Sequence, residues 1–406
     1  MFLLDIDAFR KLEASMKRKQ QRDRKIAIER YASGEQITSI ARSLGYSRKW
    51  VYKWIERHEC SDDAPDWHQS RSSCPHSSPR QLTGDVVKAV KLVRLSLYNE
   101  GLFCGAQAIE WELKELGFEP VPSLRSISRI LSREELTHRR TGSYEPKGRK
   151  YPTLVANEVN QVHQTDYVGP CYLNGPVRFY SLNSVDLATG RCAINPVFNK
   201  AGQNTVDAIW SSWLRLGIPK HQQVDNESVF FGSRQFPRGM GNLIRLCLLH
   251  GVEPWFIPMG EPWRNGVVEK FNDHYRGGFL RRVAMQGEED LRQESLMFEQ
   301  KHNTRYRYSK LRGRTPQRAL DQSRQSLRFP ESAQAPRWPL PKPTSGRYHL
   351  VRFIRSNLLL DIFGERFKMP LEAAYEYAVA TIDVEKQRLS VSIDGATIAE
   401  FEYGAR

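Results

Sequence analysis

The chain has 406 residues, 40% of them hydrophobic and 11% aromatic, with 61 Lys and Arg against 46 Asp and Glu. This apolar content excludes global disorder, and the length predicts two to four domains. The formal net charge of +15 favours a polyanionic partner, nucleic acid above all, although charge alone also fits a merely basic protein.

Cysteine usage and hydropathy bear on where the protein works. The six cysteines include no CxxC pair, which is typical of reduced thiols rather than of a disulfide framework. Asp5 and Asp7 interrupt the apolar N-terminal stretch, so we do not expect a signal peptide. No apolar run approaches the roughly 20 residues that a membrane span needs. We therefore expect a cytoplasmic protein without membrane contact.

Residues 23–58 are predicted to form a helix-turn-helix domain. Ile40, Ala41 and Leu44 recur at helical spacing, Gly45 breaks the helix, and Ser47 can cap the next one. A basic second helix after a Gly turn is typical of DNA recognition, whereas the alternative is a helical hairpin with a solvated basic face. The DNA contacts predicted on this helix are Arg48, Lys49, Tyr52 and Lys53.

Residues 84–136 are predicted to form a second helix-turn-helix-like DNA-binding domain, flanked by linkers at 59–83 and 138–150. Ser123 follows Pro122, which cannot continue a helix, and can therefore cap the last helix of the segment. Arg125 and Arg129 point outward from that helix and are the predicted DNA contacts. The alternative is a helical spacer. A Cys2His2 zinc site from His58, Cys60, Cys74 and His76 matches no common finger spacing, so a linker is favoured there.

Residues 151–320 alternate strand and helix patterns. Three consecutive strands are expected within 158–198, then a helix over 204–217, short strands at 220–226 and 252–259, and a helix over 265–283. A strand meander followed by alternating helices and strands predicts a mixed five-stranded sheet with helices on its faces.

Three acids lie at informative places in this region. Asp166 falls within the first strand, Asp225 ends a short strand, and Glu269 lies one turn into a helix. An acid inside an apolar strand is costly unless it is paired or bound to a metal. Three converging carboxylates supply the hard oxygen ligands that Mg²⁺ prefers, and two such ions suit in-line phosphoryl displacement.

The motifs QTDY around Asp166, VDNESVFF around Asp225 and PWRNGVVEKFN around Glu269, followed by HNTRYRYSKLRGRTPQRAL, resemble a known family. They are similar to the retroviral-integrase-type core of bacterial insertion-sequence transposases. The resemblance implies an RNase H-like fold in which the three acids form a catalytic DDE triad and hold two Mg²⁺ or Mn²⁺ ions. It also implies a basic residue seven positions after the Glu, here Arg276. Lys270, next to Glu269, is a further expected DNA contact.

Two departures from the family pattern stand next to the second acid. The family usually has Gly two positions after the Asp, whereas this chain has Glu227, which adds charge near the expected metals. In addition, 43 residues separate Asp225 from Glu269, a longer gap than usual, and the excess is expected to form a loop at 233–242. Asp186 is expected to begin a turn, and Asp207 and Asp273 to lie on helix surfaces.

The C-terminal third is predicted to hold a basic segment, a linker and a small β domain. Residues 301–318 carry seven Lys and Arg and no acid, and Arg305 and Arg307 are predicted DNA contacts. The tyrosines between them could stack on unpaired bases or pack on the core. Proline-rich residues 321–347 are expected to be a linker. Residues 347–404 read as short strands, which we expect to close into a small β-barrel.

The resemblance implies a DNA transposase that cleaves the ends of a mobile element and joins the 3′-hydroxyls to target DNA. Its partners would be double-stranded DNA and further copies of the chain, at least a dimer, in a bacterial, nucleoid-associated setting. The chain has no P-loop pattern, so a helper ATPase would be a separate protein, and the sequence does not identify one. Two alternatives stay open. One is a catalytically weak or inactive transposase-derived DNA-binding regulator, and the other is an RNase H-like nuclease.

Overall fold

A computed structural model describes residues 6–60, 66–70, 82–137, 150–173, 177–236 and 238–405, with side chains from residue 18 onward. The chain divides into two compact units, Met1–Leu82 and Thr83–Arg406. Cys74 and His76 of the zinc site that we weighed lie outside the described residues. None of the described helices is long and apolar enough to cross a membrane.

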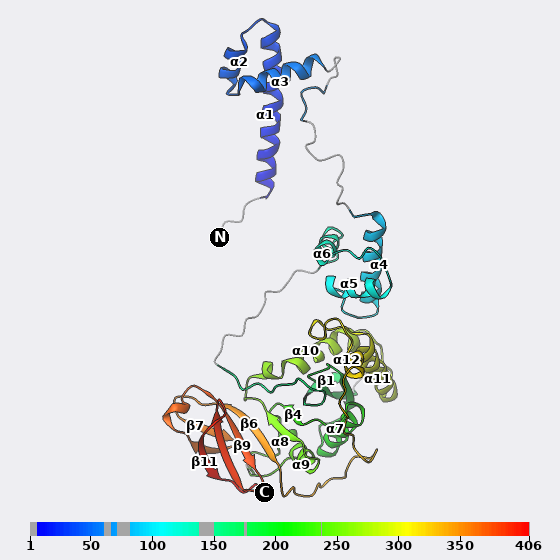
Figure 1. Cartoon of the computed structure of the whole chain (residues 1–406), viewed down its shortest axis with the longest axis vertical. Helices are drawn as coiled ribbons and strands as arrows, with labels where there is room; N and C mark the ends of the chain where they lie inside the picture. Colours follow the sequence, from blue (N-terminus) through cyan, green and yellow to red (C-terminus); the bar gives the residue numbers. More distant parts are fainter. Residues whose placement is uncertain are drawn as a thin grey trace. The chain divides into compact units, whose positions relative to one another are not determined.

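The first unit is a three-helix domain (Figure 1). Its helices are α1 (Ile6–Ala32), α2 (Ile37–Leu44) and α3 (Arg48–Glu59). Gly45 ends α2 in the left-handed region at φ 74°, and the Ser47 side chain accepts a hydrogen bond from the Trp50 amide, as the sequence predicts. The core lies between the three helices and contains Ile40, Val51 and Trp54. The helix-turn-helix prediction for this segment is confirmed.

The second unit begins with three short helices, α4 (Gly84–Asn99), α5 (Ala106–Glu115) and α6 (Leu124–Arg133). The Ser123 side chain accepts a hydrogen bond from the Ser126 amide, so the predicted cap of α6 is present. The helices bury apolar side chains against one another, among them Val90, Ile109 and Ile127. Local sequence patterns were sufficient to find these helices and the cap.

A mixed sheet forms the centre of the second unit. Its first five strands are β1 (Val162–Tyr172), β2 (Arg178–Asp186), β3 (Cys192–Val197), β4 (His221–Val224) and β5 (Glu253–Phe256). β1, β2 and β3 pair antiparallel, while β4 pairs parallel with β1 on one side and with β5 on the other. This is the mixed five-stranded sheet that the sequence predicts.

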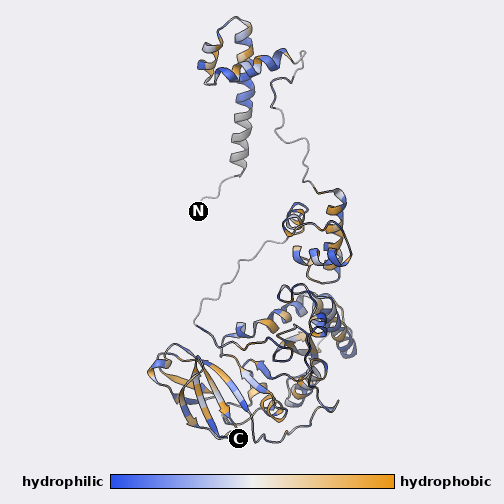
Figure 2. Cartoon of the chain, in the orientation of Figure 1, coloured by the Kyte–Doolittle hydropathy of each residue, from blue (hydrophilic) through white to orange (hydrophobic). Residues whose placement is uncertain are grey.

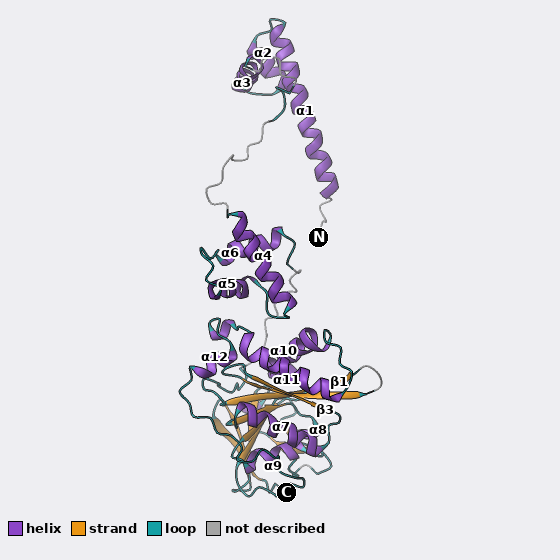
Figure 3. Ribbon diagram, turned by 90° about the vertical axis from the view of Figure 1, so that its right-hand side faces the viewer, coloured by secondary structure: helices purple, strands orange, loops and turns teal. Residues whose placement is uncertain are grey.

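Helices cover both faces of this sheet (Figure 3). On one side lie α7 (Gly202–Leu216), α8 (Ser228–Phe231) and α9 (Asn242–Leu249). On the other lie α10 (Gly266–Tyr275), the π-helical turn η2 (Arg276–Leu280), α11 (Glu288–Arg305) and α12 (Pro316–Asp321). Neighbouring residues of β1 face opposite sides of the sheet: Tyr167 packs in the core under α7 and α9, and Val168 packs in the core under α10 and α11. Short 3₁₀ turns are η1 (Pro262–Asn265), η3 (Ser309–Leu311) and η4 (Leu371–Ala373).

Side chains of α11 occupy the free edge of β3. The Ile194 amide donates to Glu299, and the Cys192 amide donates to Asn303. Pro196, the next residue facing that edge, has no amide hydrogen to offer. The buried Glu299 and Asn303 therefore satisfy backbone groups that would otherwise be a template for pairing with another strand.

The C-terminal strands continue the core sheet, which corrects the prediction of a small barrel. They are β6 (Arg347–Phe353), β7 (Leu359–Ile362), β8 (Glu365–Lys368), β9 (Tyr377–Asp383), β10 (Arg388–Ile393) and β11 (Ala396–Glu402). β6 pairs parallel with β5, giving one nine-stranded sheet in the order β11-β10-β9-β6-β5-β4-β1-β2-β3, and β7 and β8 form a hairpin. Among the described strands, no pairing closes this segment on itself. Hydrophobic and polar residues alternate along it, and its apolar side shares the core of α7 and α9 (Figure 2).

The proline-rich segment 321–347 lies along α7 and α9. The Trp210 indole donates to the Ser332 carbonyl, and the Trp338 amide donates to the Gln203 side chain. Arg245 of α9 donates to the Leu340 carbonyl. The sequence predicted a linker here, whereas the structure shows a segment held to the core by hydrogen bonds. Its composition could not reveal this, because the contacts are made by backbone groups.

Candidate active site

Asp166 and Asp225 lie at adjacent positions on neighbouring strands. β1 and β4 pair in parallel with Gln164 opposite Gln223, and the same register brings Asp166 beside Asp225, the residue after β4. Neighbouring strands lie about 5 Å apart, so the two carboxylates share one small region at the end of β4. Both side chains are half-buried.

A chain of buried amides orients Asp166. Asn272 of α10 donates to Asp166 Oδ2 at 2.9 Å, Asn183 of β2 donates to Asn272 at 2.9 Å, and the Ser181 hydroxyl donates to Asn183 at 2.6 Å. The sequence reasoning missed Asn272, although it lies one helical turn after Glu269 and so shares its face. The carboxylate therefore has one oxygen fixed by a side chain from the helix that carries the third acid.

The N-terminus of α10, which carries Glu269, is fixed to the sheet by β1. Gln164 Oε1 accepts hydrogen bonds from the amides of Val267 and Val268, both at 3.1 Å, and so satisfies two of the unpaired amides at the start of α10. Asn265 also donates to the Thr165 carbonyl at 3.1 Å. Gln164 was missed as well. Its signal was a polar residue two positions before Asp166, hence on the same face of the strand.

Asp225 is held by its own turn and, indirectly, by the C-terminal strands. Its Oδ1 accepts a hydrogen bond from the Glu227 amide at 3.0 Å. The next residue, Asn226, donates to the Ile257 carbonyl at 2.6 Å and accepts from the Arg352 guanidinium at 2.9 Å. Arg352 belongs to β6 and is only 5% exposed. The C-terminal segment thus supports the backbone next to the second acid, which the sequence did not predict.

The three carboxylates interact with one another electrostatically. Burial raises the pKa of Asp166 to about 6, and the charges of Glu227 and Glu269 contribute. Burial likewise raises the pKa of Asp225 to about 6, with contributions from Glu227 and Asp166. The pKa of Glu269 is raised by burial first, then by Asp273 and Asp225. We call these three electrostatically interacting carboxylates the acidic cluster, and burial disfavours the ionised form of each of them.

Glu227 is bound to a lysine. Lys200 Nζ lies 2.6 and 2.8 Å from the two carboxylate oxygens of Glu227 and 4.6 Å from the centre of the Tyr167 ring. The pair compensates the charge that this chain carries where the resembled family has Gly. In this arrangement Glu227 faces Lys200 rather than serving as a further ligand.

The chemistry of the cluster suits a divalent cation, although its arrangement is not that of a preformed metal site. Carboxylate oxygens are the ligands that Mg²⁺ takes. The raised pKa values reflect burial first and repulsion between the acids second, and a bound cation would favour the ionised carboxylates. Within the described residues, however, no three His, Cys, Asp or Glu side chains are grouped closely enough to hold an ion. Asp166, Asp225 and Glu269 fit a divalent cation by the chemistry of their donor atoms.

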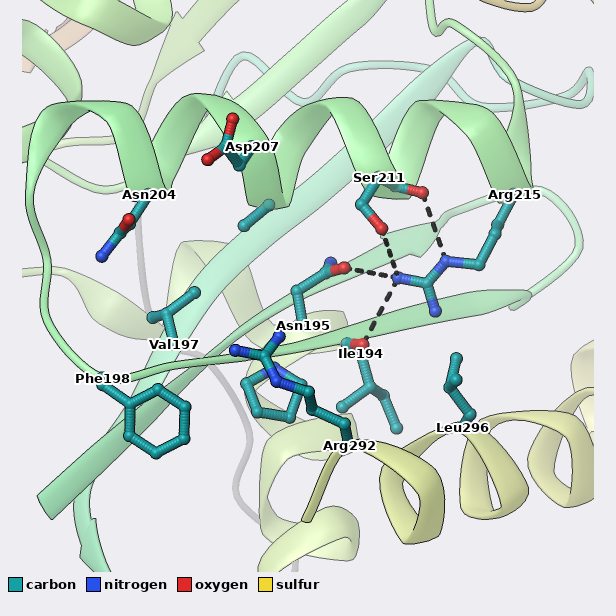
Figure 4. Close-up of a pocket in the computed structure, with 12 residues that line it drawn as sticks. Ile194, Asn195, Val197, Phe198, Asn204, Asp207, Ser211, Arg215, Arg292 and Leu296 are labelled. Carbon is teal, nitrogen blue, oxygen red and sulfur yellow. Dashed lines mark hydrogen bonds between the residues drawn. The ribbon is translucent and has the colours of Figure 1, made fainter. Parts of the chain in front are cut away.

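Other acids and basic groups have structural roles. Asp186 is buried and accepts hydrogen bonds from the amides of Asn160 and Thr189, so it closes a turn, as expected. A cavity of about 590 Å³ between β3, α7 and α11 contains none of the three acids. Its Arg215 already donates to the Ile194 carbonyl, Asn195 and Ser211 (Figure 4).

The predicted DNA contacts divide into free and occupied groups. Exposed side chains are found for Arg48, Lys49, Tyr52, Lys53, Arg125, Arg129, Lys270 and Arg276. Arg305 instead pairs with Glu100 at 3.1 Å, and Arg307 pairs with Glu112 and Glu115. Both guanidinium groups are thus engaged within the chain in this structure, and DNA contact by Arg305 and Arg307 stays a prediction. Arg305 and Arg307 hold α4 and α5 to the core through these ion pairs. The sequence did not reveal the pairs, because the acids belong to helices far away along the chain.

The tyrosines of the same segment pack inward. Tyr306 is 1% exposed, and its ring contacts Phe103 and His274. Tyr308 also contacts Phe103, with ring centres 5.6 Å apart. Of the two possibilities left by the sequence, core packing holds in place of base stacking.

Comparison with known proteins supports the N-terminal assignment. Residues 18–65 match the family described as a homeodomain-like domain. The match covers the helix-turn-helix unit and therefore implies DNA binding by that unit. A search of curated proteins finds no relative of this chain.

Solved structures similar to the chain include two viral integrase assemblies. The catalytic core domain of HTLV-2 integrase, in complex with magnesium, has 16% identity and a TM-score of 0.31, covering 39% of this chain and 95% of that one. The simian T-cell lymphotropic virus intasome, in complex with PP2A regulatory subunit B56 gamma, has 14% identity and a TM-score of 0.37, covering 78% and 96%. These scores are too low to bear on activity, which has to be argued from the site.

Proposed function

We propose that this chain is a DNA transposase of the DDE type that cuts the ends of a mobile element and joins them to target DNA. The observation that carries the proposal is the acidic cluster of Asp166, Asp225 and Glu269, set on two adjacent strands and one helix of a chain that also contains a homeodomain-like domain. Carboxylates arranged in this way are costly in a folded protein and are suited to holding cations during phosphoryl transfer.

The residues of the chain divide the work as follows. Asp166, Asp225 and Glu269 would hold two Mg²⁺ or Mn²⁺ ions, whose chemistry is to activate the attacking oxygen and stabilise the leaving oxygen. Asn272 and Gln164 keep Asp166 and α10 in register, so that the helix and strand carboxylates face the same phosphate. Exposed Lys270 and Arg276, on α10 and at its end, would contact the DNA backbone.

Hydrolysis frees a 3′-hydroxyl at each element end, and that hydroxyl attacks target DNA, so every P–O bond broken is replaced by one formed. Joining two ends at one target needs at least two protomers. The helix-turn-helix unit would select the end sequence, with Arg48, Lys49, Tyr52 and Lys53 facing the groove. Arg125 and Arg129 of α6 would extend the contact, and the setting would be a bacterial nucleoid.

One assay separates this function from its rivals. The full chain is incubated with a duplex carrying its element end, a plasmid target and Mg²⁺. Cleavage followed by joining supports the proposal. Cleavage without joining indicates a nuclease, and sequence-specific binding without either reaction indicates a regulator. Glu227, which stands where the resembled family has Gly, favours a catalytically weak regulator, but its ion pair with Lys200 offsets part of the charge that it adds near the expected cations.

A further inference from the structure

A groove of about 1260 Å³ opens next to the second acid. Its lining includes Asn226 and Glu227, which follow Asp225 directly, and the loop residues 232–236 and 239–241. Arg245 of α9 and Trp338 of the proline-rich segment form the other side. We call this the loop groove. It is built largely from the residues that lengthen the spacing between Asp225 and Glu269.

The loop groove carries uncompensated positive charge. Its acid, Glu227, is bound to Lys200, so those two charges cancel. Arg234 donates to the Met259 sulfur, and Arg245 donates to the Met240 and Leu340 carbonyls, all of them neutral acceptors. No acid of the described chain forms an ion pair with either guanidinium. Both are therefore available, as charges, to a phosphate backbone.

Two large aromatic side chains are exposed in the same groove. Phe236 is 71% exposed, and Trp338 is 48% exposed with the Arg245 guanidinium 5.8 Å from its ring centre. Phe329 is exposed to a similar degree elsewhere, so exposure alone does not distinguish a site. What distinguishes the groove is the combination of guanidinium groups that have no acid partner with aromatic faces, the pattern by which proteins hold unpaired nucleotides.

The two ends of the loop are fixed to each other. The Gly241 amide donates to the Phe231 carbonyl at 2.9 Å, and a Cβ on Gly241 would meet the Phe231 carbonyl carbon at 2.3 Å. Only glycine allows this approach, so the loop leaves and rejoins α8 and α9 at one point. The loop therefore presents Phe236 from an anchored base.

We propose that the loop groove binds unpaired DNA nucleotides next to the scissile phosphate, stacking bases on Phe236 and Trp338 while Arg234 and Arg245 contact the backbone. The inference rests on the proposed function, because it names the part of the DNA substrate that reaches the site. Asn226 and Glu227, the two residues after Asp225, line the groove, so nucleotides bound there would lie near the second acid. Fully paired DNA would gain nothing from the aromatic faces, since its bases are already stacked.

The test uses the full chain in EDTA, so that no cleavage occurs. The probe is a duplex whose end carries unpaired nucleotides with a fluorescent adenine analogue that is quenched by stacking, and the control probe is fully paired. We expect Phe236→Ala and Trp338→Ala each to abolish part of the quenching and to weaken binding of the unpaired probe on the order of 5- to 100-fold. Phe329→Ala is the matched control and should change neither.

Backbone contact has its own readout. Arg234→Ala should lower the slope of log affinity against log salt by about one for the unpaired probe, whereas Arg324→Ala, an exposed arginine outside the groove, should leave it unchanged. Wild-type quenching and affinity in both aromatic variants would overturn the proposal, as would an equal loss on the paired probe. If the groove behaves as expected but the wild type never cuts DNA with Mg²⁺, the proposed function fails and the groove stands.

Discussion

Replacing Asp225 by asparagine should stabilise the metal-free protein at alkaline pH. Folding raises the pKa of Asp225 from its usual 3.8 to about 6, chiefly because the side chain is buried. A shift of roughly two units corresponds to about 3 kcal/mol of differential stability. Since the folded-state pKa is raised, this stability is fully present below about pH 4 and is lost as the pH rises through about 6.

The wild type at about pH 8 therefore lacks this contribution, because its buried Asp225 is ionised, whereas the side chain of the Asp225→Asn protein stays neutral at every pH. We expect the variant to exceed the wild type by up to about 3 kcal/mol at about pH 8 and to match it near pH 4. Asn can still accept the Glu227 amide hydrogen bond, so the turn is retained. Adding Asp166→Asn to the Asp225→Asn protein should raise the stability by less than Asp166→Asn does alone, because the two carboxylates titrate as a coupled pair.

The measurement is urea unfolding in EDTA at both pH values, followed by tryptophan fluorescence. Trp210 and Trp213 of α7 lie in the core that contacts this end of the sheet. Asp207→Asn, an exposed carboxylate on the same helix, is the control and should change stability little at either pH. A variant no more stable than wild type at about pH 8, or equally stabilised near pH 4, would refute the electrostatic account of the cluster.

Three further predictions concern positioning groups. Arg352→Met removes the donors to Asn226 and the Ile257 carbonyl, so the free energy of unfolding should fall by roughly 2–4 kcal/mol and the cleavage rate should fall as well. Urea unfolding and a cleavage assay measure the two effects, and the exposed Arg366→Met is the control. Gln164→Ala leaves two amides of α10 without their acceptor and should lower the free energy of unfolding by about 2 kcal/mol in the same assay. Cleavage should also fall, because the helix that carries Glu269 is no longer fixed to β1. Unchanged cleavage would contradict this role. Ser47→Ala should destabilise the helix-turn-helix unit by about 1 kcal/mol in thermal unfolding and weaken binding of element-end DNA, and an unchanged melting curve would contradict the cap.

Much of the fold follows from local chemistry that the sequence displays. The caps Ser47 and Ser123 are found where expected, since each depends only on residues a turn away. The turn at Asp394 and Gly395 adopts positive φ, as Asp-Gly hairpin turns do. Strands and helices around the three acids were predictable for the same reason.

Features that depend on distant residues could not be read from the sequence. The β5–β6 pairing joins segments nearly a hundred positions apart, and a strand pattern does not reveal its partner. Arg307 looked like a DNA contact because its own neighbours are basic, yet its partners Glu112 and Glu115 come from another helix. The support that Arg352 gives to Asn226 was hidden in the same way.

The joining reaction of an Asp166→Asn protein tests the account most directly. The substitution preserves the size of the side chain and an acceptor for Asn272, while removing the charge that a divalent cation needs. With element-end duplex, plasmid and Mg²⁺, we predict that the wild type gives joined product and that the variant gives none, although it binds the duplex as tightly. Joining at the wild-type rate by the Asp166→Asn protein would contradict the assignment of the carboxylate cluster as the catalytic centre.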